Sequence, residues 1–293
     1  LLGYVVSLLP HSMLRGLAVC IGYLLRLLSL HRYDVSVDNI RKAFPAYTDT
    51  EVNTIAQGAY TSLSITFLEL LSTPYRTDGY IVSRFNFKQP ELIRRFLTEM
   101  QPLIFLSGHF GNWEWGAYAA GILFNPLLIV IKNQRNTQAD TILNSYRTRG
   151  GNRVVPMDKA AKDIISTIRS KGIVALLTDQ AADPQKDIFV DFFSRPAVSF
   201  EAPASLALRY QVPVVCFYTI RRSDGTYDVE MEQIDHNDLQ NNREGIATLV
   251  QRYVHSLEHY ARLYPSLWSW QHKRWKYHLN DYPNTYYAHR ISE

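Results

Sequence analysis

Short apolar runs alternate along most of the chain with segments whose apolar residues recur at helical spacing. The runs that predict strands are residues 103–106, 127–131, 154–155, 173–177 and 214–219. The helical patterns between and after them cover 90–100, 112–123, 140–147, 158–172, 201–210 and 243–263. Strands that are apolar throughout need helices on both faces, and alternation with helices favours parallel pairing. The sequence therefore predicts an α/β fold with a parallel-rich mixed sheet, in which residues 227–232 are a candidate antiparallel edge strand.

The first 30 residues are strongly apolar but are interrupted by Arg15 and Arg26. Between Arg15 and Arg26 only ten uncharged residues occur, whereas a spanning helix needs about 20 apolar residues. We expect this segment to lie in a membrane interface with both arginines reaching the headgroups. The alternative is a buried helix of a soluble protein. Because the chain begins at Leu1 rather than Met, we expect it to be a fragment or a processed product.

A helix start divides the chain into two expected regions. Thr48 and Glu51 have the spacing of a capping box, and apolar residues then recur at helical spacing up to Pro74. We therefore expect residues 1–75 to form a helical, membrane-associating layer. Residues 76–293 are expected to form one continuous α/β unit that carries the chemistry.

Composition narrows the possible classes of protein. The net charge of +4 is a mild preference for anionic partners and is not typical of nucleic-acid binders. Two cysteines, Cys20 and Cys216, are too few for a disulfide framework. We expect no nucleic-acid partner.

Candidate chemistry is concentrated in the stretch Ser-Gly-His-Phe-Gly-Asn-Trp-Glu at residues 107–114. It follows a predicted buried strand, where ligand sites form in open α/β sheets. His109 can act as a general base, and Glu114 can reach back to orient its imidazole from the turn that enters the helix. The alternative is that His109 caps the helix and Glu114 favours its first turn. Ser107 lacks the sequence frame of a nucleophile.

This stretch resembles the H-x4-D/E motif of glycerolipid acyltransferases, and its surroundings resemble the lipid A late acyltransferase family. The likeness extends to residues 39–45, Asn-Ile-Arg-Lys-Ala-Phe-Pro, and to the C-terminal region. It implies transfer of an acyl chain from an acyl carrier protein thioester to a hydroxyl of a membrane glycolipid, such as a lipid A precursor. It also implies a catalytic pair of His109 and Glu114. Backbone N–H groups of residues 108–111, or a nearby cation, would stabilise the oxyanion.

Further polar residues follow predicted strands or helices and resemble binding elements of the family. The expected substrate-binding residues are Lys132, Asn133, Arg147, Arg149, Asp179 and Gln180. Arg135 belongs to the same polar stretch as Lys132. Phosphates of a donor suit such cations, while solvated helix ends and loop caps are the alternatives. Residues 181–200 carry Phe189, Phe192 and Phe193, which would line an acyl channel or belong to the core.

Two C-terminal features need separate interpretation. Residues 268–278 mix tryptophans with cations, which suits anionic lipid headgroups or aromatics packed on the sheet. His255 and His259 match a zinc motif, H-x-x-E-H, but only Asp281 and Glu293 are acids farther along, so a third ligand is doubtful. We expect no metal and no prosthetic cofactor.

Together these patterns predict a membrane acyltransferase at the cytoplasmic face of a bacterial inner membrane. An acyl carrier protein or acyl-CoA would be the donor, because both carry the same phosphopantetheine thioester. The alternatives are another acceptor, such as a phosphatidylinositol mannoside or an aminolipid, a zinc hydrolase, and a non-catalytic lipid-binding module.

Overall fold

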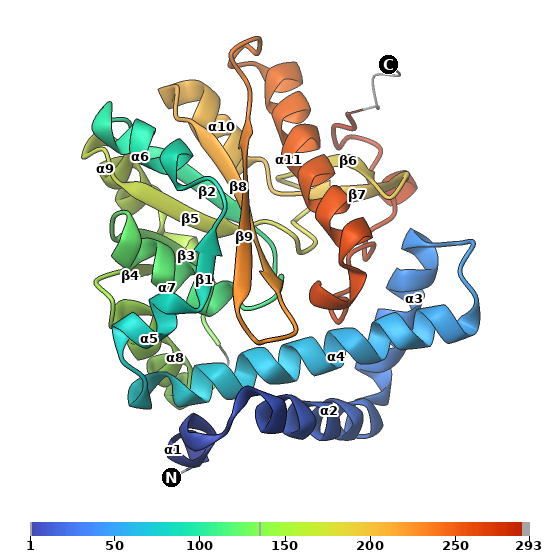
Figure 1. Ribbon diagram of the computed structural model, residues 1–293. Coiled ribbons are helices and arrows are strands. Elements are labelled where there is room, and N and C mark those ends of the chain that lie inside the picture. Colours follow the sequence, from blue (N-terminus) through green and yellow to red (C-terminus); the bar gives the residue numbers. More distant parts are fainter. Residues whose placement is uncertain (1, 135, 289–293) are drawn as a thin grey trace.

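A seven-stranded sheet forms the centre of the molecule (Figure 1). The computed structural model describes residues 2–134 and 136–288. The strands of this sheet are β1 (Phe85–Phe87), β2 (Leu103–Ser107), β3 (Leu127–Ile131), β4 (Arg153–Pro156), β5 (Ile173–Leu177), β8 (Val214–Arg221) and β9 (Tyr227–Ile234). Their order is β1-β9-β8-β2-β5-β3-β4. Strands β8, β2, β5, β3 and β4 are parallel, and β9 is antiparallel to β8. The predicted parallel-rich sheet is confirmed, although β1, not β9, forms the edge.

Helices cover both faces of the sheet. They are α5 (Asp78–Ser83), α6 (Pro90–Thr98), α7 (Trp113–Leu123), α8 (Thr137–Thr148), α9 (Ala161–Arg169), α10 (Ala202–Tyr210) and α11 (Arg243–Leu263). Short 3₁₀ turns occur at Thr73–Tyr75, Met157–Lys159, Pro265–Leu267 and Leu279–Asp281. Leu103 and Phe105 of β2 pack into one core with α5, α6 and α7, while Ile104 and Leu106 pack into the other with α9, α10 and α11. This alternation explains why every residue of β2 is buried.

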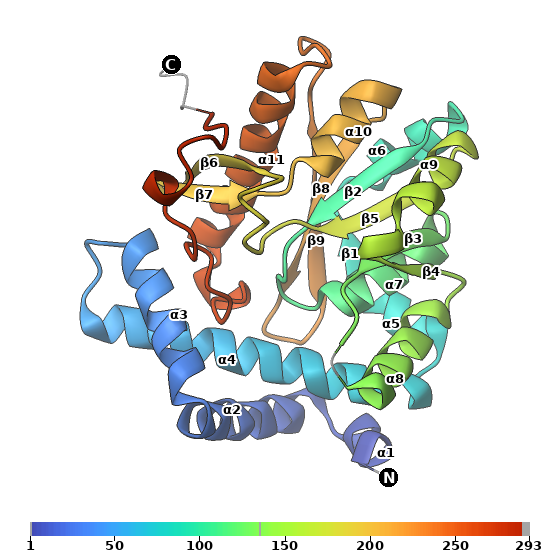
Figure 2. The same cartoon turned by 180° about the vertical axis from the view of Figure 1, so that it is seen from behind.

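Four helices precede the sheet and lie along one end of it. They are α1 (Leu2–Leu8), α2 (His11–Leu28), α3 (Leu30–Ala43) and α4 (Asp49–Ser72). Thr48 and Glu51 form the predicted capping box at the start of α4. Figures 1 and 2 show α4 passing along the sheet, with α1 and α2 on its outer side.

Helix α2 packs one face on α4 and exposes most of the rest. Leu14, Ala18 and Gly22 are its buried residues. A Cβ on Gly22 would lie 3.0 Å from the backbone nitrogen of Thr61, so the two helices approach closely there. By length and composition α2 could cross a membrane. Only 17% of this helix is buried, whereas the core helix of a soluble protein is mostly buried.

Residues 188–199 form an element that the sequence did not predict. Strands β6 (Ile188–Phe192) and β7 (Arg195–Ser199) form a separate antiparallel hairpin. Phe189, Phe192 and Phe193 of this region are buried in the core, so the structure supports the core alternative over an acyl channel.

The C-terminal tryptophans are buried, so for these rings the structure supports packing in the core over contact with lipid. Trp268, Trp270 and Trp275 pack into the main core, where Phe192 contacts Trp268 and Trp275. Arg274 is also buried and donates to the carbonyl of Val198 and the hydroxyl of Ser199. The aromatic segment therefore covers the β6–β7 hairpin.

Candidate active site

The register of two neighbouring strands brings His109 and Asp179 together. Strands β2 and β5 pair in parallel, with Ser107 opposite Leu177. His109 and Asp179 each follow two residues after this pair. His109 Nδ1 lies 2.9 Å from Asp179 Oδ1, and the His109 backbone N–H donates to Oδ2 at 2.8 Å. A carboxylate on Nδ1 leaves Nε2 as the nitrogen that accepts a proton.

The His109–Asp179 pair is largely shielded from water, and the opposite charges of its two members stabilise each other. Asp179 is 3% exposed, and its Oδ2 also accepts the indole N–H of Trp268 at 2.9 Å. Burial opposes ionisation, but His109 and these donors lower the pKa of Asp179 to about 2. Burial likewise opposes the charged imidazole, yet the Asp179 carboxylate raises the pKa of His109 above its ordinary value. The His109 side chain keeps 25% exposure, so a substrate can reach it.

The loop that carries His109 is anchored through its carbonyl groups. The carbonyl of His109 accepts from the backbone N–H of Ser269, and that of Phe110 accepts from the Thr219 hydroxyl. Gly111 has φ +54°, and a Cβ there would lie 1.9 Å from the Thr219 carbonyl oxygen. Glycine is therefore required at this position.

Three backbone N–H groups of this loop are also occupied. That of His109 donates to Asp179, that of Phe110 to the carbonyl of Gly108, and that of Gly111 to the carbonyl of Leu267. Of the groups at residues 108–111 that were candidates for stabilising an oxyanion, these three already have partners. The N–H of Gly108 and a nearby cation stay as candidates.

Glu114 contacts Arg147 rather than His109, so the predicted contact between Glu114 and the imidazole is not made. Arg147 Nε lies 2.8 Å from Glu114 Oε2, and Arg147 Nη2 lies 2.5 Å from Oε1. Asn112 caps α7, which places Glu114 in the first turn facing α8. After burial and Asp179, Glu114 is a further influence on His109 and raises its pKa.

We predict that Glu114→Gln lowers the free energy of unfolding by about 3 kcal/mol, because it leaves Arg147 buried without its counter-charge. Both side chains are largely shielded from solvent. The matched control is Glu91→Gln, which breaks an exposed pair with Arg94 and should change stability by about 0–1 kcal/mol. Urea unfolding followed by fluorescence measures both, and equal effects would show that the Glu114–Arg147 pair is energetically an ordinary surface pair.

The other predicted site residues differ in their surroundings. Lys132 and Asn133 are exposed just beyond β3, beside the carboxyl end of β5. Gln180 is half-buried next to Asp179. Arg149 donates to the carbonyls of Thr73 and Arg76 and pairs with Asp78, so it connects α8 to the start of α5. Arg135 lies outside the described residues.

Trp268 is a site residue that the sequence did not indicate. Its indole N–H fixes Asp179, and its backbone forms a β-bridge with Phe110. Eighty-nine residues separate Trp268 from Asp179, so no local pattern indicates the contact.

The zinc motif does not assemble a site in the described part of the chain. His255 and His259 are exposed on α11. Glu258 between them is buried, accepts the backbone N–H of Phe193 and pairs with Arg262. No group of three potential metal ligands occurs among the described residues.

A sequence model of one family, described as bacterial lipid A biosynthesis acyltransferase, matches residues 1–277. The chain belongs to this family. The resemblance found in the motif at residues 107–114 is thereby confirmed. Two characterised family members are similar to the chain. One is lipid A biosynthesis acyltransferase 2 of Shigella flexneri, 23% identical over 189 residues. The other is lipid A biosynthesis acyltransferase of Haemophilus influenzae, 20% identical over 198 residues.

These two alignments cover 64% and 66% of the chain. They span 60% and 61% of the relatives' own lengths, about three fifths in each case.

Proposed function

We propose that the protein is an O-acyltransferase of lipid A synthesis, which moves a fatty acyl chain from a thioester to a hydroxyl of a lipid A precursor. The observation that carries this proposal is the His109–Asp179 pair at the carboxyl end of β2 and β5. His109 lies in the motif that the family resemblance singled out, and a partly exposed imidazole beside a buried carboxylate is suited to general-base catalysis.

In the proposed reaction His109 Nε2 takes the proton of the acceptor hydroxyl as its oxygen attacks the thioester carbonyl. The C–S bond of the tetrahedral intermediate then breaks, and the imidazolium returns the proton to the leaving thiolate. Asp179 orients the ring and stabilises the imidazolium. The Glu114–Arg147 pair lies near the ring without contacting Nδ1, and its two charges act on the pKa of His109 in opposite directions.

The donor is proposed to be an acyl carrier protein or acyl-CoA thioester. Lys132 is exposed at the carboxyl edge of the sheet, where it can meet a phosphate of the phosphopantetheine arm or the oxyanion. Asn133 and Gln180 offer uncharged hydrogen-bonding groups at the same edge. Arg149 contributes by holding α8, and with it Arg147, in position.

The N-terminal helices are proposed to hold residues 76–293 on the cytoplasmic face of the inner membrane. Exposed apolar side chains on α1 and α2 are Leu2, Tyr4, Val5, Leu8, Met13, Leu17, Val19, Tyr23, Leu24, Leu27 and Leu28. One face of α2 packs along α4, which favours a helix lying in the interface over one crossing the bilayer. This position would let a hydrophobic acceptor reach His109 without leaving the membrane.

The test is single-turnover transfer in detergent micelles, with labelled lauroyl-acyl carrier protein as donor and a tetraacylated lipid A precursor as acceptor. We expect a labelled glycolipid with the wild type and not with His109→Ala. Consumption of donor that depends on His109 but yields no glycolipid would point to another acceptor. If neither this donor nor lauroyl-CoA is consumed, the proposed chemistry is wrong, and a lipid-binding role gains support.

A further inference from the structure

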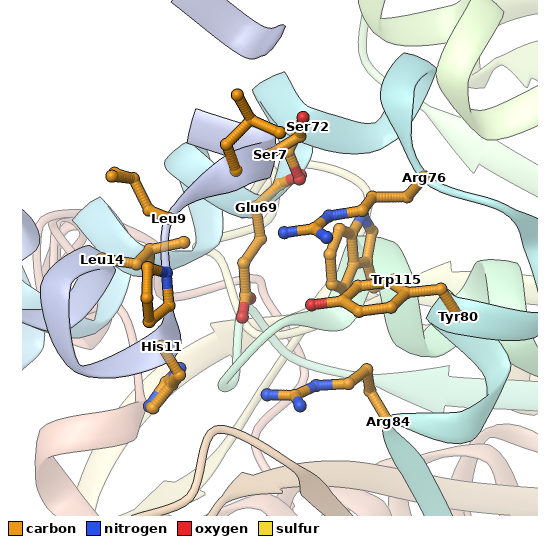
Figure 3. A pocket seen from close by; sticks show the side chains of 12 residues that line it. Ser7, Leu9, His11, Leu14, Glu69, Ser72, Arg76, Tyr80, Arg84 and Trp115 are labelled. Atoms are coloured by element: carbon orange, nitrogen blue, oxygen red, sulfur yellow. The ribbon is translucent and has the colours of Figure 1, made fainter. Parts of the chain in front are cut away.

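A cavity of about 230 Å³ lies between the N-terminal helices and the start of the α/β part (Figure 3). Leu8 and His11 line it from the side of α1 and α2, Glu69 from α4, and Arg76 and Arg84 from the segments flanking α5. Water occupies about 30 Å³ per molecule, so the cavity has room for several waters or for one phosphate group.

Two arginines, Arg76 and Arg84, line this cavity together with Tyr80. Figure 3 shows the guanidinium groups of Arg76 and Arg84 on either side of Tyr80, directed into the same space. Arg76 lies 4.1 Å and Arg84 5.8 Å from the centre of the Tyr80 ring. Neither forms an ion pair within the described residues; Arg84 donates only to the carbonyl of Asp224.

Both arginines also have a buried donor without a partner. The Nε atoms of Arg76 and Arg84 are shielded from solvent and have no hydrogen-bond acceptor in the described part of the chain. Buried donors are nearly always paired, and an unpaired one destabilises the protein. An oxygen-rich anion between the two guanidinium groups would supply the missing acceptors.

The carboxylate that faces the cavity does not fill this role. Glu69 Oε2 already accepts the Tyr227 hydroxyl at 2.5 Å and the Asn112 amide at 2.8 Å. Burial raises the pKa of Glu69, and the charge of Arg221 opposes this shift. Burial and then the charge of Arg84 lower the pKa of His11, as expected where the local potential is positive.

We propose that this cavity binds a phosphate group, held between the guanidinium groups of Arg76 and Arg84. Arginine forks match the geometry of phosphate oxygens. Leu8, Leu9 and Leu14 line the cavity on the side of the apolar helices, so the phosphate of a lipid headgroup fits as well as a free phosphate ion. The site is separate from the His109–Asp179 pair and does not depend on the proposed acyl transfer.

Trp115 lines the cavity and provides a direct probe of occupancy. The full chain is labelled with 5-fluorotryptophan, and the ¹⁹F resonance of Trp115 is assigned with Trp115→Phe. Dihexanoyl-phosphatidylglycerol, inorganic phosphate and dihexanoylglycerol, which has the chains without the phosphate, are titrated at constant ionic strength. We expect the phosphatidylglycerol to shift this resonance and dihexanoylglycerol to leave it unchanged. The same shift with inorganic phosphate would support a phosphate site filled from solution.

Arginine replacement decides whether the shift reports the proposed site. Arg76→Gln with Arg84→Gln should weaken phosphate binding about tenfold or more, the usual effect of losing charged hydrogen bonds. Arg94→Gln with Arg169→Gln removes the same charge from exposed helix positions and should leave binding unchanged. If the double variant does not fold, Arg76→Gln alone is used, because its guanidinium stacks on the Tyr80 ring and forms no ion pair in the described part of the chain. No shift with either phosphate compound, an equal shift with dihexanoylglycerol, or equal binding by the cavity variants would overturn the proposal.

Discussion

Replacing His109 with alanine is expected to lower the turnover number by about 10²–10⁴, the usual contribution of a general base. The alcohol of the acceptor is a poor nucleophile at neutral pH, and His109 is the base that the geometry offers. The fold should survive, because the imidazole is 25% exposed and the loop is anchored by its backbone. The measurement is single-turnover acyl transfer with saturating donor and acceptor.

The control for this variant is His255→Ala, which removes an exposed histidine from α11. Its turnover number should equal that of the wild type. Full turnover by His109→Ala would rule out His109 as the base.

Replacing Asp179 with asparagine is expected to lower the turnover number by about 10³–10⁴, since the corresponding change in a Ser-His-Asp triad lowers it by about 10⁴. The amide no longer stabilises the imidazolium, and it allows the tautomer with the proton on Nε2. The volume of the side chain is kept, so the hydrogen bond from Trp268 can remain.

The pH dependence separates this role from a structural one. In the wild type Asp179 raises the pKa of His109, so the rate should fall with acidification at a pH above the ordinary histidine value of about 6.5. Without the carboxylate the fall should occur at lower pH. Asp238→Asn, which changes an exposed aspartate paired with Arg252, should leave the profile unchanged. A lower rate in Asp179→Asn with an unshifted profile would indicate that Asp179 only supports the loop.

Periodicity predicted the sheet well because its strands are buried on both faces. Strand β2 is apolar throughout, and β8 is buried along nearly all of its length. Strand β1 has three residues, too few for a pattern, and β7 contains Pro196. Such short or proline-containing segments carry little local signal, and their pairing depends on the rest of the fold.

The position of the motif was predictable, but the partner of His109 was not. Glu114 is near in sequence, whereas Asp179 is 70 residues away and meets His109 because β5 adjoins β2. Strand order is set by the crossover connections and not by local residues. The place of the tryptophans near the C-terminus stayed open for a similar reason, because composition cannot distinguish an aromatic surface from an aromatic core.

The anchoring of the His109 loop has a consequence for the newly made chain. The loop contacts Thr66 of α4, 45 residues from Gly111, and Thr219 of β8, 109 residues from Phe110. It also forms a β-bridge with Trp268 through Phe110. Contacts between residues so far apart in the sequence form late in folding, because the entropy cost of closing the long intervening loops must be met first. If His109 is the base as proposed, a chain still on the ribosome is expected to lack the working site, and catalytic activity should report completed folding.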